Sequence, residues 1–434
     1  INCTFKDNYA INAGAMHNGT ARDCTFINNG ASYWGGAMYY GSVYNCTFID
    51  NYADYGGALW FCFACENCYF ESNFASLYGG AVNTAPVVNC RFIDNYAKYG
   101  GAVYMYMHYD FEDTLNSIFM NNSAVYGGAI YVEGNNAIVS ATIYDSSAGL
   151  DDAQDLGFRG EGGAIYVAGH NTLVHDSVIA NTHADNNGDG GAVYLEKSFD
   201  SDFTRCIFIN NTAEVNGGGV DWQEGAHDGR LLNSIFINNT AWRSGGAAYW
   251  NGYNGTMINC SFTDNRAVGN WTGTVPKGVV IVNDTIGGNG GAMVWRGSLG
   301  DIENCNFTSN TALYLGGAIH LRYNTNVTFS YCNFTSNHAG VVPAGVTVND
   351  TVTMSGGAIY FNTGAVNCTI ISSTFEDNIA ETNGGALAWF EGAEHGVINN
   401  SVFIICVIFT DKGVKYSGTI YTFIIDNISC LRTV

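Results

Sequence analysis

Charged residues and long apolar segments are both scarce in this sequence of 434 residues. Only 12% of the residues are charged and 47% are hydrophobic, so the chain can build a buried core and a disordered chain is excluded. Lys and Arg number 16 against 38 Asp and Glu, and the net charge of −22 repels nucleic acid and anionic membranes. The longest apolar run, 402–409, is far shorter than the roughly 18 residues of a membrane-spanning helix. Neither nucleic-acid binding nor a membrane span is expected.

The chain is filled instead by copies of one motif, seen clearly in residues 48–59. In each copy a Phe is followed three residues later by Asn and two further on by Ala, and a glycine pair comes next. These pairs begin at Gly35, Gly56, Gly79, Gly100, Gly127, Gly162, Gly190, Gly217, Gly245, Gly290, Gly316, Gly356 and Gly384. The shortest period, about 21 to 23 residues, suits one turn of a β-solenoid. The sequence opens inside a repeat, without a signal peptide, so we expect a processed product or a fragment.

Two short strands per repeat are predicted from the alternation of residue types. In Cys46-Thr47-Phe48 and its copies, Cys and Phe share one face, so both are expected to form inward ladders. After Gly-Gly-Ala the first and third residues are apolar, including Tyr40 and Phe61 at the third position, and are also expected to face inward. The Asn is expected to take the left-handed corner conformation and to bond to its copies above and below. The glycine pair predicts a tight bend.

These features predict an all-β fold, a right-handed parallel β-helix that forms a single-stranded solenoid of about fourteen coils. The hand follows from the strong preference of parallel crossovers. Residues 1–396 are expected to form the repeat domain. Residues 397–434 abandon the Gly-Gly-Ala rule and are expected to form closing coils or a capping hairpin. An uncapped end would expose strand edges and favour self-association.

The paired motifs resemble the repeats of chlamydial polymorphic outer membrane proteins and of adhesin-like surface proteins of methanogenic archaea, over residues 1–396. This resemblance implies an extracellular, cell-surface β-helix that serves adhesion or envelope structure and is not an enzyme. The partners it implies are surface glycans or proteins of a host or neighbouring cell, or further copies that assemble into fibres. No cofactor is expected from it.

An outward aromatic row is the main candidate for ligand binding. The second residue after Gly-Gly-Ala should face outward by period two. An exposed row is therefore predicted at Tyr39, Trp60, Tyr104, Tyr131, Tyr166, Tyr194, Tyr249 and Tyr360.

Four insertions leave the same corner, between the Ala and the glycine pair: 149–161, 185–188, 268–289 and 340–355. Insertions on one face of a solenoid often form its binding side, although long surface loops are also tolerated at little cost. Residues 275–285 and 342–351 share a core and predict a duplicated hairpin-like loop. The first insertion carries Asp151, Asp152 and Asp155, a candidate calcium site with Asp185 and Asp189 as further ligands, or else a solvated acidic loop.

A carbohydrate-active enzyme that acts on the loop-bearing face is the alternative function, because parallel β-helices include polysaccharide lyases and glycoside hydrolases. A lyase needs a cation or basic group and a strong base, and a glycosidase needs two opposed carboxylates. Asp221 with Glu224 is the best carboxylate pair in the sequence, and an ordinary exposed pair explains it equally well. The nine His residues show no metal-ligand spacing. No catalytic residue is assigned.

Cysteines and glycosylation sequences complete the set of candidate sites. Cys62, Cys65 and Cys68 have a spacing typical of metal or redox sites. Cys68 belongs to the inward ladder, which leaves two residues to act together, so a structural role and mostly free, buried thiols are predicted. Asn-x-Ser/Thr sequences favour surface exposure, and the candidate glycosylation sites are Asn45, Asn283 and Asn349.

Overall fold

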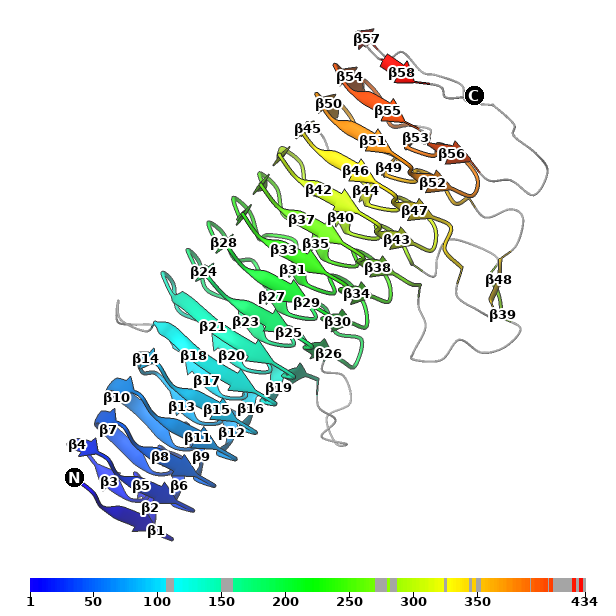
Figure 1. Ribbon diagram of the computed structural model, residues 1–434. Helices are drawn as coiled ribbons and strands as arrows, with labels where there is room; N and C mark the ends of the chain where they lie inside the picture. Colours follow the sequence, from blue (N-terminus) through cyan, green and yellow to red (C-terminus); the bar gives the residue numbers. More distant parts are fainter. Residues whose placement is uncertain are drawn as a thin grey trace. The chain divides into compact units, whose positions relative to one another are not determined.

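A computed structural model describes strands and turns along most of the chain (Figure 1). The described residues are 1–106, 113–149, 159–269, 279–281, 287–323, 326–342, 346–348, 353–390, 392–404, 406–408, 424–426 and 429–431. The chain divides into two compact units, Ile1–Ile207 and Phe208–Val434. Within the described ranges, no helix is long and apolar enough to cross a membrane.

The strands of the first unit are of four kinds, repeated from coil to coil. Post-glycine strands follow the glycine pairs, or Ala13-Gly14 in the first coil: β3 (Met16–His17), β7 (Met38–Tyr44), β10 (Leu59–Glu66), β13 (Val82–Asn83), β17 (Val103–Met105), β20 (Ile130–Val132), β23 (Ile165–Val167) and β27 (Val193–Leu195). Short connecting strands come next in some coils: β4 (Thr20–Arg22), β14 (Val87–Val88), β24 (Leu173–His175) and β28 (Asp202–Thr204).

The other two kinds carry the Phe and the Ala of the motif. The phenylalanine strands and their equivalents are β1 (Thr4–Lys6), β5 (Thr25–Ile27), β8 (Thr47–Ile49), β11 (Tyr69–Glu71), β15 (Arg91–Ile93), β18 (Thr114–Met120), β21 (Ile138–Tyr144) and β25 (Val178–Ala180). The next strand of this kind, β29 (Ile207–Ile209), begins at the last residue of the unit. The alanine strands are β2 (Tyr9–Asn12), β6 (Gly30–Trp34), β9 (Tyr52–Tyr55), β12 (Phe74–Tyr78), β16 (Tyr96–Tyr99), β19 (Ser123–Tyr126), β22 (Ser147–Ala148) and β26 (His183–Ala184).

The second unit repeats the same order. Its post-glycine and connecting strands are β31 (Val220–Trp222), β32 (Arg230–Leu232), β35 (Ala248–Trp250), β36 (Thr256–Ile258), β40 (Met293–Trp295), β41 (Gly300–Glu303), β44 (Ile319–Leu321), β45 (Val327–Ser330), β49 (Ile359–Phe361), β50 (Thr369–Ile371), β53 (Leu387–Trp389), β54 (Val397–Asn399) and β57 (Ile424–Asp426). Its phenylalanine strands and their equivalents are β33 (Ile235–Ile237), β37 (Ser261–Thr263), β42 (Asn306–Thr308), β46 (Asn333–Thr335), β51 (Thr374–Glu376), β55 (Val402–Ile404) and β58 (Ser429–Leu431). Its alanine strands are β30 (Thr212–Ala213), β34 (Thr240–Ala241), β38 (Arg266–Ala267), β43 (Thr311–Ala312), β47 (His338–Ala339), β52 (Ile379–Ala380) and β56 (Val407–Ile408).

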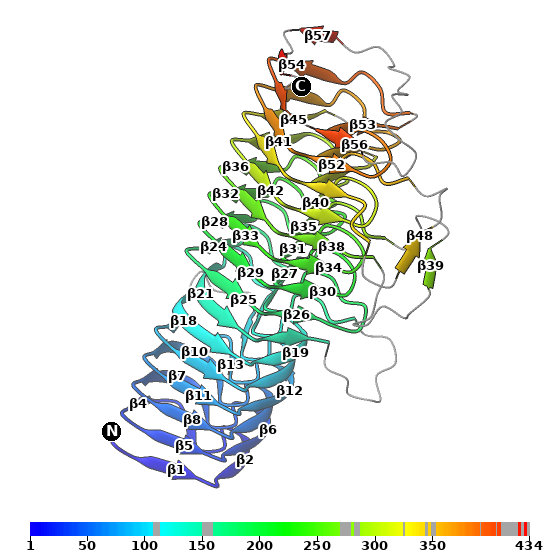
Figure 2. The same ribbon diagram turned by 45° about the vertical axis from the view of Figure 1, so that its right-hand side comes forward.

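Within each unit, strands of one kind pair in parallel with the same motif residues opposite one another. In the first unit Phe26 pairs with both Phe5 and Phe48, and in the second Phe262 pairs with Phe236 and Phe307. The chain therefore winds as a parallel β-helix, as the repeat period predicts (Figures 1 and 2). The prediction of two strands per repeat is incomplete, because the segment around the motif Ala also pairs with its copies.

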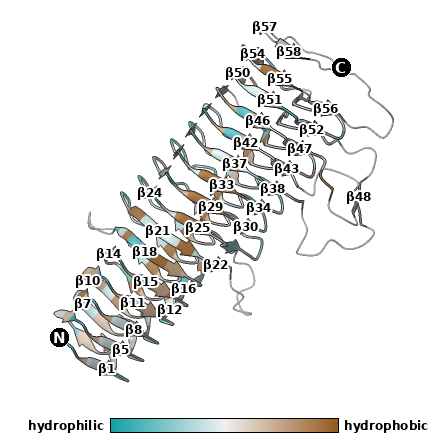
Figure 3. Ribbon diagram, viewed as in Figure 1, coloured by the Kyte–Doolittle hydropathy of each residue, from teal (hydrophilic) through white to brown (hydrophobic). Residues whose placement is uncertain are grey.

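The motif Phe and Cys face the core as predicted. Consecutive Phe rings from Phe5 to Phe119 stack with centroids 4.7 to 4.8 Å apart. In the second unit Trp250 stacks between Trp222 and Trp295 at 4.2 and 4.8 Å. The outward residues of the phenylalanine strands vary in polarity from coil to coil. In β25 and β33 all residues are apolar, so these strands appear brown in Figure 3, and Ile235 of β33 is 39% exposed.

A buried asparagine ladder runs beside the Phe ladder in each unit. Asn51 donates its side-chain amide to Asn73 Oδ1, and Asn73 donates to Asn95 Oδ1, both at 3.0 Å. The predicted bonding between copies is thus confirmed. The predicted left-handed conformation is wrong for these asparagines, because the corner is turned by the preceding residue, such as Asp50 with φ of 54°.

The glycine pair turns the other corner, as predicted. Gly56 has φ of +66°. A Cβ on Gly57 would lie 2.0 Å from the carbonyl oxygen of Gly80, so the backbones of successive coils meet without room for a side chain. This close approach explains why the motif repeats two glycines.

All four insertions follow alanine strands: β22 and β26 in the first unit, and β38 and β47 in the second. In the second unit, β39 (Val279–Ile281) and β48 (Val346–Val348) pair in parallel, with Val279 opposite Val346. The two strands lie side by side in Figures 1 and 2. The expectation of a hairpin inside each loop is wrong for these strands, because they pair between the two insertions.

The segment beyond residue 396 continues the parallel pairing in the part that the structure describes. β54 pairs with β50 and β57, and β55 pairs with β51 and β58. The boundary at residue 396 stays a prediction.

Candidate functional site

The glycine corner of the first unit places two rows of aromatic rings against each other. One row is the predicted post-glycine row. The other consists of the residue directly before each glycine pair: Trp34, Tyr55, Tyr78, Tyr99 and Tyr126. Across the corner, the ring of Tyr78 lies 4.5 Å from that of Tyr104, and Tyr99 lies 5.4 Å from Tyr131. We call these residues the pre-glycine row, and it covers the post-glycine row.

The predicted exposure is wrong for five of the eight post-glycine aromatics. Tyr104, Tyr166, Tyr194, Tyr249 and Tyr360 are buried. Within the first unit, Tyr131 stacks on Tyr166 at 4.6 Å, and Tyr166 also contacts Tyr194. A ring held between its copies and against a pre-glycine residue loses its contact with water, although it lies outside the central core. Tyr39, Trp60 and Tyr131 remain half-buried.

The two buried rings of the second unit have different neighbours. Arg296 donates to the hydroxyl of Tyr249 at 2.7 Å. Tyr360 belongs to a buried cluster with Leu313, Tyr314 and Met354. These two tyrosines therefore stabilise the corner and do not present a surface for binding.

An exposed aromatic patch remains in the first coils, on β7 and β10 and the end of β6. We define the aromatic patch as Trp34, Tyr39, Tyr40, Trp60, Phe61 and Phe63. Trp34 stacks on Trp60 at 5.3 Å, Tyr39 on Tyr40 at 4.4 Å, and Phe63 is 62% exposed.

A register shift between Cys62 and Ala64 accompanies the patch. Tyr40 and Phe61 have φ of 55° and 53°. Their predicted inward direction is wrong, because both side chains are only half-buried and contact the other patch residues.

Carboxylates replace the aromatics of the pre-glycine row in the last coils of the first unit. Glu161 and Asp189 precede their glycine pairs, and Arg159 Nη1 lies 3.9 Å from Asp189 Oδ2. Tyr166 donates its hydroxyl to Glu196 Oε2 at 2.9 Å. We call Arg159, Glu161, Asp189 and Glu196 the acidic cluster. Burial raises the pKa of Glu161 to about 7, and repulsion by Asp189 adds to this.

The raised pKa of Glu161 predicts a pH-dependent contribution to stability. The folded state holds the proton more tightly than the unfolded chain, whose carboxyl has an ordinary value near 4.5. The contribution is therefore fully present below about pH 4.5 and is lost as pH rises through about 7. Relative to wild type, Glu161→Gln should gain on the order of 3 kcal/mol between pH 4 and 8. Urea unfolding at several pH values measures this difference, and parallel pH curves for the two proteins would contradict it.

Comparison with protein families gives the hand of the fold. Residues 214–427 match the model of the right handed β-helix region. The fold is a right-handed parallel β-helix. This confirms the hand expected from the preference for right-handed crossovers. Residues 116–133 match the Chlamydia polymorphic membrane protein repeat, so the chain carries repeats of this type.

Individual proteins of known structure resemble this chain only distantly. No curated protein matches the chain. Among solved structures, a PL6 alginate lyase in complex with a trisaccharide shares 10% identity over 96% of this chain and 79% of that chain, with a TM-score of 0.42. A TibA fragment hyper-glycosylated by TibC shares 12% over 92% and 99%, with a TM-score of 0.25. DFA-IIIase from Arthrobacter chlorophenolicus A6 without its lid shares 10% over 91% and 89%, with a TM-score of 0.33. At these values the similarities carry no conclusion about activity.

The two carboxylates of the predicted pair, Asp221 and Glu224, differ in their exposure to solvent. Asp221 is fully buried and accepts a hydrogen bond from Gln223 at 2.9 Å, whereas Glu224 is exposed. A buried and an exposed carboxylate do not face a common substrate, so the prediction of Asp221 with Glu224 as the best pair is wrong.

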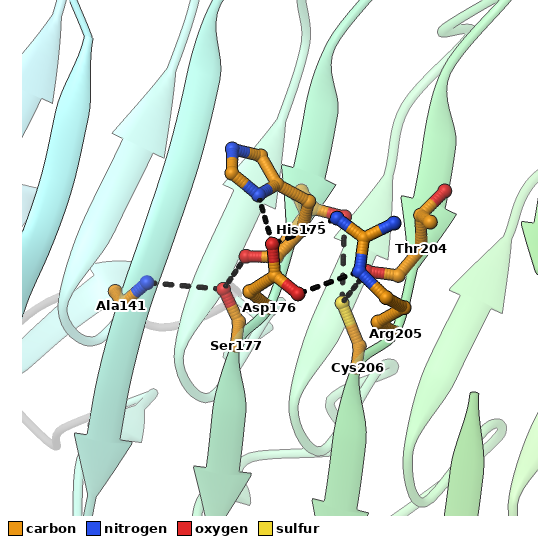
Figure 4. Close-up of polar contacts among 8 residues, drawn as sticks. Ala141, His175, Asp176, Ser177, Thr204, Arg205 and Cys206 are labelled. Atoms are coloured by element: carbon orange, nitrogen blue, oxygen red, sulfur yellow. Dashed lines mark hydrogen bonds and ion pairs between the residues drawn. The ribbon is translucent and has the colours of Figure 1, made fainter. Parts of the chain in front are cut away.

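Adjacent His, Asp and Ser residues at one corner of the β-helix also form no catalytic relay (Figure 4). Arg205 donates to both oxygens of Asp176 at 2.6 and 2.8 Å, and His175 Nδ1 lies 2.7 Å from the same carboxylate. The hydrogen bonds from Arg205, and to a lesser extent that from His175, hold the pKa of Asp176 below its usual range. Ser177 is buried, donates to the carbonyl of His175 at 2.9 Å and accepts from the Ala141 amide at 3.0 Å. The ion pair ties two coils together.

The remaining predicted sites fall partly outside the described residues. Asp151, Asp152 and Asp155 of the candidate calcium site lie outside them, as do the sequon residues Asn283 and Asn349. Asn45 is exposed, as predicted, and its side chain donates to Asp23 Oδ1 at 3.2 Å. Its exposure leaves it accessible for glycosylation, which stays a prediction.

Sequence reasoning missed the pre-glycine row. Its signal is present in the sequence, because Trp34, Tyr55, Tyr78, Tyr99 and Tyr126 all stand directly before a glycine pair, and Glu161 and Asp189 take the same position. Alternation counted forward from the glycine pair does not include the residue before it, so this row lies outside that pattern. A residue before a sharp bend faces the residues after it, so both sides of the corner have to be compared.

Proposed function

We propose that this protein is a non-catalytic extracellular surface protein, an adhesin or structural envelope component related to the adhesin-like proteins with polymorphic-membrane-protein repeats. The repeat match at residues 116–133 supports this proposal. The net charge of −22 argues against nucleic acid as a partner. An accessible sequon at Asn45 is compatible with exposure at a cell surface.

The observation that carries the proposal is the aromatic patch. Trp34 is 36% exposed and Phe63 62% exposed, and contacts between the rings join them into one aromatic surface. Aromatic faces offer apolar area to the C–H faces of sugar rings, and the polar rims of Tyr and Trp supply hydrogen bonds. We infer that the partner is a surface glycan of a host or neighbouring cell.

Binding of glycans should depend on the patch. Trp60→Ala and Trp34→Ala are each expected to weaken the binding of a glycan identified on an array about tenfold or more, because stacked aromatics act as hot spots. Titration calorimetry on the purified chain measures the change. Tyr331→Ala is the matched control, since Tyr331 is 56% exposed in the second unit and outside the patch. Equal affinity of the Trp60 variant and wild type would remove the patch from the proposal.

A carbohydrate-active enzyme is the second candidate, and the acidic cluster favours it. A carboxyl with a pKa of about 7 beside a second carboxylate and an arginine has the parts of a general acid and its partner. Cleavage of a bound glycan that is abolished by Glu161→Gln and retained by Trp60→Ala would support an enzyme. Intact glycan after prolonged incubation supports the non-catalytic proposal.

A further inference from the structure

Three buried thiols of the first unit converge at one corner of the coil. The Sγ atoms of Cys65, Cys68 and Cys90 all lie within 4.8 Å of one another, and those of Cys65 and Cys90 are 3.7 Å apart. All three residues are at most 3% exposed. Among the residues that the structure describes, this is a group of side chains with the chemistry and spacing to hold a metal ion.

The convergence arises from one exceptional residue. Cys68 and Cys90 belong to the inward ladder, in which Cys46 stands before them and Ser117 after them. Cys65 lies on the other side of the corner at Asn67, in register with Val43 and Val87 of the adjacent coils. Of these three aligned positions, only Cys65 carries a thiol, and the other two are valines. The Cys65 thiol contacts that of Cys90, the ladder cysteine of the following coil. Cys62 is not a member of the group.

We propose that Cys65, Cys68 and Cys90 form a binding site for one soft d10 cation, Cu(I), coordinated by three sulfurs. A trigonal ion with metal–sulfur bonds of about 2.3 Å needs its sulfurs about 4.0 Å apart, close to the spacing already present. Soft thiolates select soft ions such as Cu(I). Structural Zn²⁺ takes four ligands, and the described residues supply three at this buried site.

Backbone amides are placed to stabilise the ligands. The amide of Cys68 donates to Cys90 Sγ and the amide of Cys46 donates to Cys68 Sγ, both at 3.4 Å. Such donors offset the negative charge that sulfur carries when it binds a metal. On binding, each coordinating thiol forms a bond to copper and releases its proton to solvent, and no electron is transferred. Because the sulfurs are buried, the ion enters before the coils close, as the chain folds.

The test uses the full chain, refolded without oxygen in the presence or absence of Cu(I). Wild type should retain one Cu(I) per chain against a Cu(I)-specific chelator, and X-ray absorption should show three sulfur neighbours. Cys65→Val and Cys90→Ser should each weaken retention by at least about 100-fold. Both replacements imitate neighbouring coils, where Val43, Val87 and Ser117 occupy the equivalent positions, so the variants should fold.

Cys332→Ser is the control, because Cys332 is a buried residue of the cysteine ladder outside the proposed site. Its backbone amide donates to the hydroxyl of Ser373, so the ladder already holds a serine next to this position. It should leave Cu(I) retention unchanged. Circular dichroism and thermal unfolding without copper show whether the variants are folded, and copper should raise the Tm of wild type but not of Cys65→Val. Unchanged retention in Cys65→Val, or an equal loss in Cys332→Ser, would overturn the site. Tighter binding of Zn²⁺ with four ligands would overturn the choice of ion.

Discussion

Gly57→Ala is expected to prevent the coils on either side of it from stacking. The added Cβ would lie 2.0 Å from the Gly80 carbonyl oxygen and 2.5 Å from that of Phe74. Both obstacles are backbone oxygens of the next coil, and the amides of the same residues bond to Gly100 and Asn51 of adjacent coils, so neither residue can move without disturbing those bonds. We expect a loss above about 4 kcal/mol, at the exceptional end of single substitutions. Urea unfolding measures the loss, and hydrogen exchange should show it centred on β9, β10 and β12.

Gly392→Ala is the matched control for this substitution. Its nearest contact would be a side-chain atom, Thr363 Cγ2, at 3.3 Å, and its φ is +88°. Only conformational strain is added, so the expected cost is about 1 kcal/mol. Similar losses for the two variants would contradict the account in which the close approach of the Gly80 carbonyl makes Gly57→Ala exceptionally damaging.

Asn73→Leu should be nearly as damaging, through hydrogen bonds that no other group can replace. Asn73 Oδ1 accepts from the backbone and side-chain amides of Asn51, and its own amide donates to Asn95 and to the Phe48 carbonyl. Leucine leaves these buried groups without partners, each at about 1 to 3 kcal/mol. A total loss of about 3 to 5 kcal/mol is expected from urea unfolding.

Asn333→Leu tests whether burial is the cause of that loss. Asn333 is exposed on β46, and its side chain makes one hydrogen bond to Asn306, at 2.9 Å. A surface change of this kind should stay within about 0.5 kcal/mol of wild type. If both leucine variants unfold at the same urea concentration, the buried ladder contributes less than its geometry implies.

The repeated parts of the fold were predictable because each motif residue has one structural task. Phe48 has to face inward to stack on Phe26 and Phe70, and Gly57 has to lack a side chain where coils touch. Such requirements recur in every coil and therefore appear in the sequence as a period. The asparagines were predicted to bond to their copies for the same reason, and they do.

The candidate sites were less predictable because they depend on contacts between different rows. The alternation of β17 places Tyr104 away from the core, and it is buried by contacts with Tyr78, on the other side of the glycine corner, and with Tyr131 of the next coil. The meeting of Cys65 with Cys90 likewise joins two positions of the motif in different coils. The repeat period describes each motif position separately, so it does not predict how close residues at different positions lie to one another.

The asparagine ladder also bears on how the chain finds its alignment during folding. Identical rungs, such as Asn51 and Asn73, would accept a chain displaced by one whole coil, since every bond could be remade. The rungs at Ser146 and Thr182 differ, because a hydroxyl takes the place of the amide in both, and the Thr182 hydroxyl donates to the carbonyl of Gly191. A displaced chain would place these residues against asparagines and leave amides unbonded. The positions without asparagine therefore make the native alignment of the repeats lower in energy than alignments shifted by one coil.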